Sequence, residues 1–116
     1  MINSNEFQYD NQTTWEDLKN GVQRQVFGYD SKVMLVKVKF DAGAVGELHE
    51  HPHSQVTYVE SGLFEMTIGD QSKMIGKGDG YYVPPHVRHG IICKEPGMLI
   101  DVFSPMREDF LVAHGS

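Results

Sequence analysis

The side chains best suited to binding a metal are concentrated in one short segment. His49, His51, His53 and Gln55 occupy alternate positions. If the segment is extended, alternate side chains project from one face about 7 Å apart, and two imidazoles placed in this way can converge on one ion at roughly 2.0–2.1 Å. His89 is a candidate further ligand from a separate strand. The pattern predicts a metal site, and a solvated His-rich loop is the alternative.

A carboxylate stands in an otherwise apolar run near the end of the chain. Leu99, Asp101 and Phe103 would share one face of a strand, with Ile100 and Val102 on the other. A carboxylate in a largely buried strand is costly unless it is paired or takes part in chemistry. We therefore predict that Asp101 is a general acid and base beside the metal, and a structural ion pair with a nearby Lys or Arg is the alternative.

Arg107 follows this run, where the chain has left the strand and can fold back over the mouth of a barrel. Its planar guanidinium suits a substrate carboxylate. The alternative is that residues 107–109, an Arg-Glu-Asp sequence, form a solvated charged turn. Phe103 is of a type found more often in a core than as a platform for a sugar ring.

Short strands are the elements that must position these side chains. Apolar residues at even positions from Val33 to Phe40 alternate with Lys37 and Lys39, which predicts a half-buried strand. Pro52 cannot donate to a central ladder, so a bulge or strand edge is expected between His51 and Gln55. Further strands are predicted over 55–60 and 63–68, joined by a turn at Ser61-Gly62, and over 71–75, 81–83, 90–93 and 98–104.

Turn residues separate these runs throughout the chain. The 12 Gly and 5 Pro fall between short apolar segments, which favours an all-β sandwich or barrel. One helical signal is present, because Thr13 and Glu16 have the spacing of a capping box and Gly21 follows as a stop. We expect one or two helical turns there.

The composition limits the classes of function. The 116 residues are enough for one domain. The formal charge is −6 and the 10 Lys and Arg are scattered, so the basic patch of a nucleic-acid binder is absent from the sequence. Cys93 is the single cysteine, and neither a signal peptide nor an apolar run that could span a bilayer is present. We expect a soluble, cytoplasmic protein that binds neither nucleic acid nor membrane.

Two half-motifs in the chain resemble those of the cupin superfamily. Gly43, five residues, His49-x-His51, three residues, Gln55, six residues and Gly62 resemble the first cupin motif, with Gln in the usual place of Glu. The stretch of residues 78–89, Gly-x5-Pro-x-His-x2-His, resembles the second. The resemblance implies a small single-domain cupin, a double-stranded β-helix or jelly-roll barrel, over residues 1–116, with flexible tails at 1–12 and 112–116.

Two positions depart from the second cupin motif. His86 stands where the family usually has Gly, and Cys93 where it often has Asn. Neither position is a ligand, so the departures concern the geometry of the turn and not the metal.

From Trp15 to Leu111 the chain is similar to the KdgF pectin-degradation cupins. The similarity is carried by HEHPHSQVTY at 49–58, VPPHVRHG at 83–90 and LIDVFSPMREDF at 99–110. It implies conversion of 4,5-unsaturated monouronates, released from pectin or alginate, into linear ketonised sugars by ring opening and tautomerisation. The alternatives are a cupin dioxygenase using Fe or Ni, and a non-catalytic sugar-binding cupin.

The resemblance also assigns residues. It implies one divalent transition metal, Ni, Zn, Fe or Mn, held by His49, His51, Gln55 and His89, and it places the family's active-site Asp, Phe and Arg on Asp101, Phe103 and Arg107. Arg107, Phe103 and His53 are the expected contacts of a small acidic sugar, and a homodimer is expected. Because Gln55 is neutral, the ion would keep its full charge as a Lewis acid.

Overall fold

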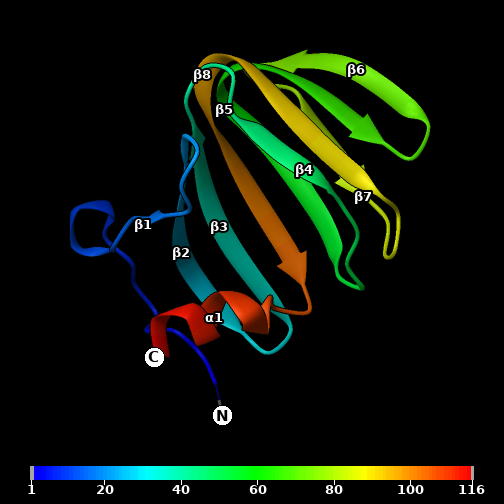
Figure 1. The fold of residues 1–116 in the computed structure, drawn as a ribbon. Helices are drawn as coiled ribbons and strands as arrows, with labels where there is room; N and C mark the ends of the chain where they lie inside the picture. Colours follow the sequence, from blue (N-terminus) through cyan, green and yellow to red (C-terminus); the bar gives the residue numbers. More distant parts are fainter. Residues whose placement is uncertain (1, 116) are drawn as a thin grey trace.

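The strands form one antiparallel sheet that curls into an open barrel (Figure 1). The computed structural model describes the backbone of residues 2–115 and the side chains of residues 2–111. The strand order is β1-β2-β3-β8-β5-β6, with β4 beside β8 and β7 beside β5. The strands are β1 (Glu16–Asp17), β2 (Val22–Asp30), β3 (Val33–Phe40), β4 (Val45–His49), β5 (Ser54–Ile68), β6 (Gln71–Gly76), β7 (Gly80–Val83) and β8 (His89–Ser104). The all-β prediction is confirmed.

Two long strands, β5 and β8, run side by side through both layers of the barrel. The prediction of separate strands on either side of residues 61–62, and again on either side of residues 94–97, is wrong. The chain bends without breaking the ladder because Gly62 and Gly97 face each other there. A Cβ on Gly62, where φ is +91°, would lie 2.7 Å from the Gly97 Cα, and one on Gly97 would meet the Ser61 carbonyl oxygen. Only glycine permits this approach.

The predicted strand over residues 33–40 is confirmed as β3. Met34 and Val36 point inward and are fully buried, while Lys39 on the outer face lies with its Nζ 4.2 Å from the Trp15 ring centroid. Two apolar clusters fill the interior. The larger is centred on Phe40, Phe64 and Leu99, and the smaller contains Met34, Val36, Phe103 and Met106.

The predicted helical turns before Gly21 are absent, and the helix lies elsewhere. Glu16 belongs to β1, and its carboxylate accepts hydrogen bonds from Arg24 at 3.0 and 3.1 Å. A 3-10 turn precedes it at Asp10–Gln12, and an α-helix that sequence patterning missed, α1 (Glu108–Gly115), follows β8. Residues 1 and 116 and the side chains of 112–115, parts of the expected tails, lie outside the described residues.

Across residues 2–115, no helix combines the length and the apolar character needed to cross a bilayer.

Candidate metal centre and active site

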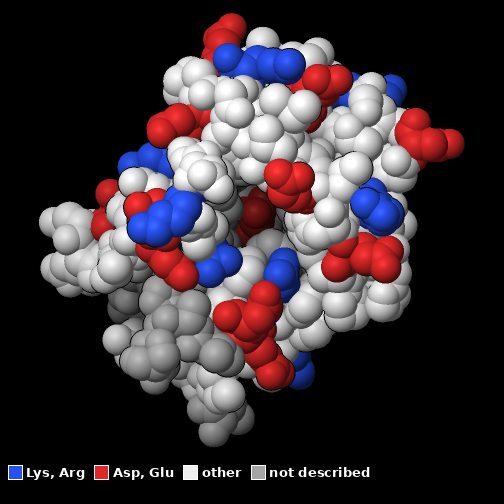
Figure 2. Space-filling model, viewed as in Figure 1, with Lys and Arg blue, Asp and Glu red and all other residues white. Residues whose placement is uncertain are grey.

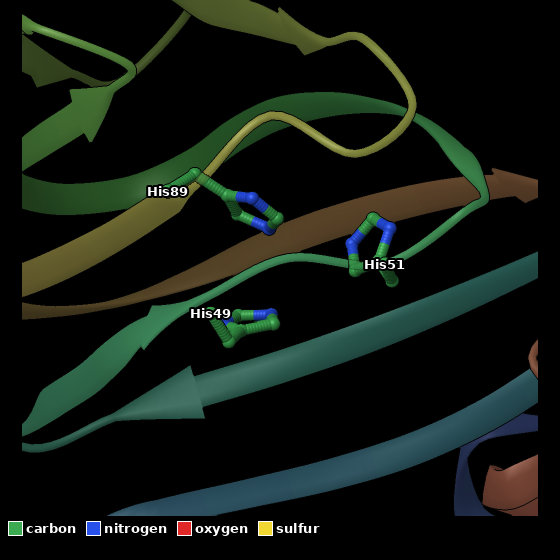
Figure 3. A group of neighbouring side chains, drawn as sticks. All are labelled: His49, His51 and His89. Carbon is green, nitrogen blue, oxygen red and sulfur yellow. The ribbon is translucent and has the colours of Figure 1, made fainter.

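Three histidine rings meet where the ends of two paired strands come together (Figure 3). His49 is the last residue of β4 and His89 the first of β8, and the two are directly paired, with ring centroids 4.3 Å apart. The His51 ring lies 4.8 Å from that of His89. One potential ligand atom from each ring lies within 4.8 Å of the others.

Residues 50–53 are not a strand, so His51 does not reach the site by strand alternation. They form the connection between β4 and β5 and contain Pro52. The expected interruption between His51 and Gln55 is present, because Pro52 lacks the N–H that a ladder needs. The alternate spacing therefore does not describe how His51 is positioned, because the link between the strands places it, whereas His49 lies in β4 and Gln55 in β5.

Backbone carbonyls orient all three rings through Nδ1. Each Nδ1 faces a carbonyl oxygen two residues away in sequence. Because a carbonyl can only accept a hydrogen bond, it favours the proton on Nδ1, which leaves the lone pair of a neutral ring on Nε2. The Nδ1–oxygen distances are 2.8 Å from His49 to Glu47, 3.1 Å from His51 to His53 and 2.9 Å from His89 to Val87.

The remaining lone pairs fit a metal ion. His89 Nε2 is buried and has no hydrogen-bond partner in the described residues. Burial lowers the pKa of His89 to about 4, so its ring is neutral as a ligand must be. The Gln55 Oε1 lies 3.1 Å from His51 Nε2. With the proton on Nδ1, these two atoms are both electron-pair donors facing one space, an arrangement that a cation would stabilise.

A cavity of about 160 Å³ adjoins these rings. It is smaller than the roughly 300–1,000 Å³ pockets that take drug-sized ligands, so it suits a small molecule. Figure 2 shows a hollow on this face, with an acidic side chain deep inside and basic side chains at its rim. The lining includes His49, Gln55, His89, Asp101, Phe103 and Arg107, whereas His51 and His53 are not part of it.

Asp101 lies at the inner wall of this cavity and is buried. Its Oδ1 accepts a hydrogen bond of 2.7 Å from the Thr57 hydroxyl. Among residues 2–111 no Lys or Arg nitrogen lies within ion-pair distance of it, which disfavours the alternative of a structural ion pair. Burial raises the pKa of Asp101 to about 6, although Thr57 and the charge of Arg107 oppose the increase. A carboxyl group with this pKa can give and accept a proton near neutral pH.

Arg107 is not part of a solvated turn. Its Nε and Nη2 donate to the two carboxylate oxygens of Asp109 at 3.1 and 2.9 Å, and its side chain is 14% exposed. The guanidinium lies 5.2 Å from the centroid of Phe103 and 4.3 Å from that of Phe110 in α1. Phe103 is buried between His51 and Phe110, with its ring centroid 5.8 Å from that of His51 and 5.7 Å from that of Phe110. It therefore belongs to the core and to the cavity wall at once.

Sequence reasoning missed several residues of the cavity. Arg24 in β2 lies 3.8 Å above the Phe110 ring, so two guanidiniums contact the same aromatic side chain at the cavity. Tyr81 lines the inner wall, where burial and the nearby Asp101 raise its pKa. Alternation in β5 and β7 was a usable signal for Thr57 and Tyr81, but nothing in the sequence around Arg24 pointed to the site.

Two further histidines, His53 and His86, lie near the site. The His53 ring packs against Phe103, with 6.4 Å between the ring centroids, and its Nδ1 has no hydrogen-bond partner in the described residues. The contact of His53 with a sugar stays a prediction. His86 is exposed and has φ +65°. The left-handed conformation favours glycine, which accounts for the Gly that the second cupin motif usually has there.

An open antiparallel barrel with two imidazoles at paired strand ends and a third from the adjoining link is typical of the cupin class of protein. Residues 36–103 match the family described as Cupin domain, and the chain belongs to that family and, within it, to the relatives of the protein KdgF. It is 39% identical to "Pectin degradation protein KdgF" of Dickeya dadantii (strain 3937), over 88% of this chain and 94% of that protein.

Solved structures agree with this assignment. The structure of KdgF from Halomonas sp. matches with a TM-score of 0.87 and 37% identity, over 92% of this chain and 99% of that one. An RmlC-like cupin from Shewanella frigidimarina NCIMB 400 matches with a TM-score of 0.92 and 46% identity, over 95% of this chain and 99% of that one.

Proposed function

We propose that this chain is a metal-dependent, isomerase-like enzyme of pectin or alginate breakdown that converts 4,5-unsaturated monouronates into linear ketonised sugars. One observation carries the proposal: a single small cavity brings together imidazoles of the histidine cluster, a buried carboxyl group and two guanidiniums. The name of the relative from Dickeya dadantii, a pectin degradation protein, supports the same class of substrate.

The charges around the cavity suit a small acidic sugar. Arg107 and Arg24 both line it, and a guanidinium can hold a carboxylate through two parallel hydrogen bonds. Asp109 already occupies Arg107 in this way, so a substrate carboxylate would exchange with or share that partner. Phe103 and Phe110 provide apolar surface beside the guanidinium for the sugar ring.

Asp101 is the group that would move the proton. It accepts the proton of the anomeric hydroxyl while the bond between the anomeric carbon and the ring oxygen breaks, which leaves an aldehyde and an enolate whose oxygen is the former ring oxygen. Asp101 then delivers that same proton to the carbon at position 4, and the enolate becomes a ketone. Atoms and electrons balance without an oxidant, since substrate and product are isomers.

His49, His51, Gln55 and His89 would hold the metal ion, which would supply Lewis-acid polarisation of the substrate's oxygen atoms. Sites rich in imidazole accept Zn, Ni, Fe or Mn, so the ligand types leave the choice open. Metal analysis of protein purified without added ions would identify the native ion.

The test is direct turnover. Purified protein is mixed with 4,5-unsaturated galacturonate, and the absorbance of the conjugated double bond is followed. We expect decay faster than the spontaneous rate, with loss of the acceleration in a chelator. Decay of the absorbance at the spontaneous rate would overturn the proposal. Oxygen uptake equal to the loss of substrate would also overturn it, in favour of a dioxygenase.

We also propose that the enzyme works as a cytoplasmic homodimer, as the family resemblance implies. Light scattering coupled to size-exclusion chromatography tests the dimer, and a monomeric mass at micromolar concentration would contradict it.

A further inference from the structure

One hydroxyl group connects the expected metal ligand Gln55 with the carboxyl group of Asp101. Gln55 and Thr57 are alternate residues of β5, and Thr57 is directly paired with Asp101 of β8. The Thr57 Oγ1 lies 3.0 Å from the Gln55 Nε2 and 2.7 Å from the Asp101 Oδ1. The side chains are therefore in one line that leads from the imidazoles to the inner wall of the cavity.

The direction of each hydrogen bond follows from what each group can offer. A hydroxyl has one proton to donate, and an ionised carboxylate can only accept. Thr57 therefore donates to Asp101 and accepts from the amide N–H of Gln55. This arrangement turns the other end of the amide, Oε1, toward His51 Nε2 at 3.1 Å. With the amide turned the other way, an NH2 group would face the imidazoles, and an NH2 group cannot be a ligand.

Burial makes this hydroxyl hard to replace. Gln55 is 5% exposed, Thr57 2% and Asp101 8%. A buried polar group that loses its partner destabilises the folded state, and Thr57 itself does not line the cavity. Thr57 Oγ1 is a hydrogen-bond partner of both Gln55 Nε2 and Asp101 Oδ1, and the Gln55 side chain also acts directly on the Asp101 carboxyl group.

We propose that Thr57 is a positioning residue that points the carbonyl end of Gln55 at the metal and holds the carboxyl group of Asp101 in place for the reaction. The part that concerns Gln55 depends only on the metal site. The part that concerns Asp101 rests on the proposed function.

Metal affinity tests the first part without any substrate. Thr57→Val keeps the shape of the side chain and removes the hydroxyl, whereas Thr57→Ser keeps the hydroxyl. Cobalt(II) is titrated into metal-free protein, and the dissociation constant and visible absorption bands are measured. We expect Thr57→Val to bind about 10–100-fold more weakly, as for other groups that orient ligands, with altered bands. Thr57→Ser should resemble the wild type. Wild-type affinity and bands in Thr57→Val would overturn the proposal.

Two controls separate positioning from general damage. Thr67→Val removes a hydroxyl from the same strand, where it shares a hydrogen bond with Ser72 near the surface, and should leave cobalt binding unchanged. Gln55→Ala removes the group that Thr57 orients, so adding Thr57→Val to it should weaken binding no further. An additive loss in the double variant would contradict the proposal. If Thr57→Val does not fold, Thr57→Ala takes its place in the same comparison of the single and double variants.

Turnover of unsaturated galacturonate tests the second part. We expect Thr57→Val, saturated with metal, to lose kcat with a smaller change in KM, and Thr57→Ser to recover it. An unchanged kcat in metal-saturated Thr57→Val would overturn the role toward Asp101. A wild-type protein without turnover would refute the proposed function, while the cobalt titration would still decide the role toward Gln55.

Discussion

His49 and His89 are directly opposite each other in the β4–β8 ladder, and their rings are 4.3 Å apart. The backbone hydrogen bonds of the ladder fix both main chains, and carbonyl oxygens fix both rings through Nδ1. The two Nε2 lone pairs are therefore in place before an ion binds. Such preorganisation reduces the ordering that metal binding would otherwise require.

Removing the metal should lower the stability of the wild type. A ligand at 100 times its Kd stabilises the folded state by about 2.7 kcal/mol, so saturating Zn²⁺ should raise Tm in calorimetry and a chelator should reverse the rise. His89→Ala should show little response. His86→Asn, an exposed change to a residue that tolerates positive φ, is the control and should respond like the wild type. An equal rise in His89→Ala would show that the ion binds elsewhere.

Asp101→Asn should remove the proton transfer and keep the fold. Its side-chain oxygen can still accept from Thr57, and a neutral amide is easier to bury than a carboxylate. We expect turnover to fall about 10²–10⁴-fold, with no loss of unfolding free energy in the metal-free protein. Asp70→Asn, in the exposed turn between β5 and β6, should keep full activity. Activity within a few-fold of wild type would exclude Asp101 as the acid and base.

The two guanidiniums at the cavity should affect substrate affinity. Lys lacks the planar fork and the flat face that stacks on Phe110. Because a hydrogen bond to a charged group contributes about 1.5–3 kcal/mol, Arg107→Lys should raise KM for the uronate about 10–100-fold, and Arg24→Lys should raise it in the same direction. Steady-state kinetics with exposed Arg88→Lys as the matched control would check this. Wild-type KM in both variants would remove the arginines from the proposed site.

Gly97→Ala should damage the fold at the bend of β5 and β8. The new Cβ would collide with the Ser61 carbonyl, which belongs to the backbone and cannot move aside as a side chain can. We expect a loss of more than about 1 kcal/mol in unfolding free energy, measured by urea denaturation. Gly76→Ala meets Leu63 Cδ1 at an ordinary 3.6 Å and should change stability far less. Equal effects of both substitutions would argue against the proposed role of the bend.

Much of the fold was predictable because strand burial is a local property. The alternation from Met34 to Phe40 is written in consecutive residues and holds in the structure. The continuous bends at 61–62 and 97 were not predictable, because a glycine marks a turn in most sequences. Glycine is required here because the backbones of β5 and β8 approach closely, and this approach exists only when segments about 35 residues apart are paired. Likewise Glu16 has the spacing of a helix cap, but Arg24 on the paired strand binds its carboxylate.

For the site, residue types and spacing alone marked His49, His51, His53, Gln55 and His89 as candidate ligands and Asp101 as an unusual carboxylate, because donor chemistry and apolar context are readable from a chain. The family resemblance reduced the ligand set to His49, His51, Gln55 and His89. Tertiary structure alone decided which ring nitrogen is free, that Thr57 links Gln55 to Asp101, and that Arg24 joins Arg107 at Phe110. These relations depend on strand register and on where α1 packs. Register is set by the pairing of distant strands, and no local pattern contains it.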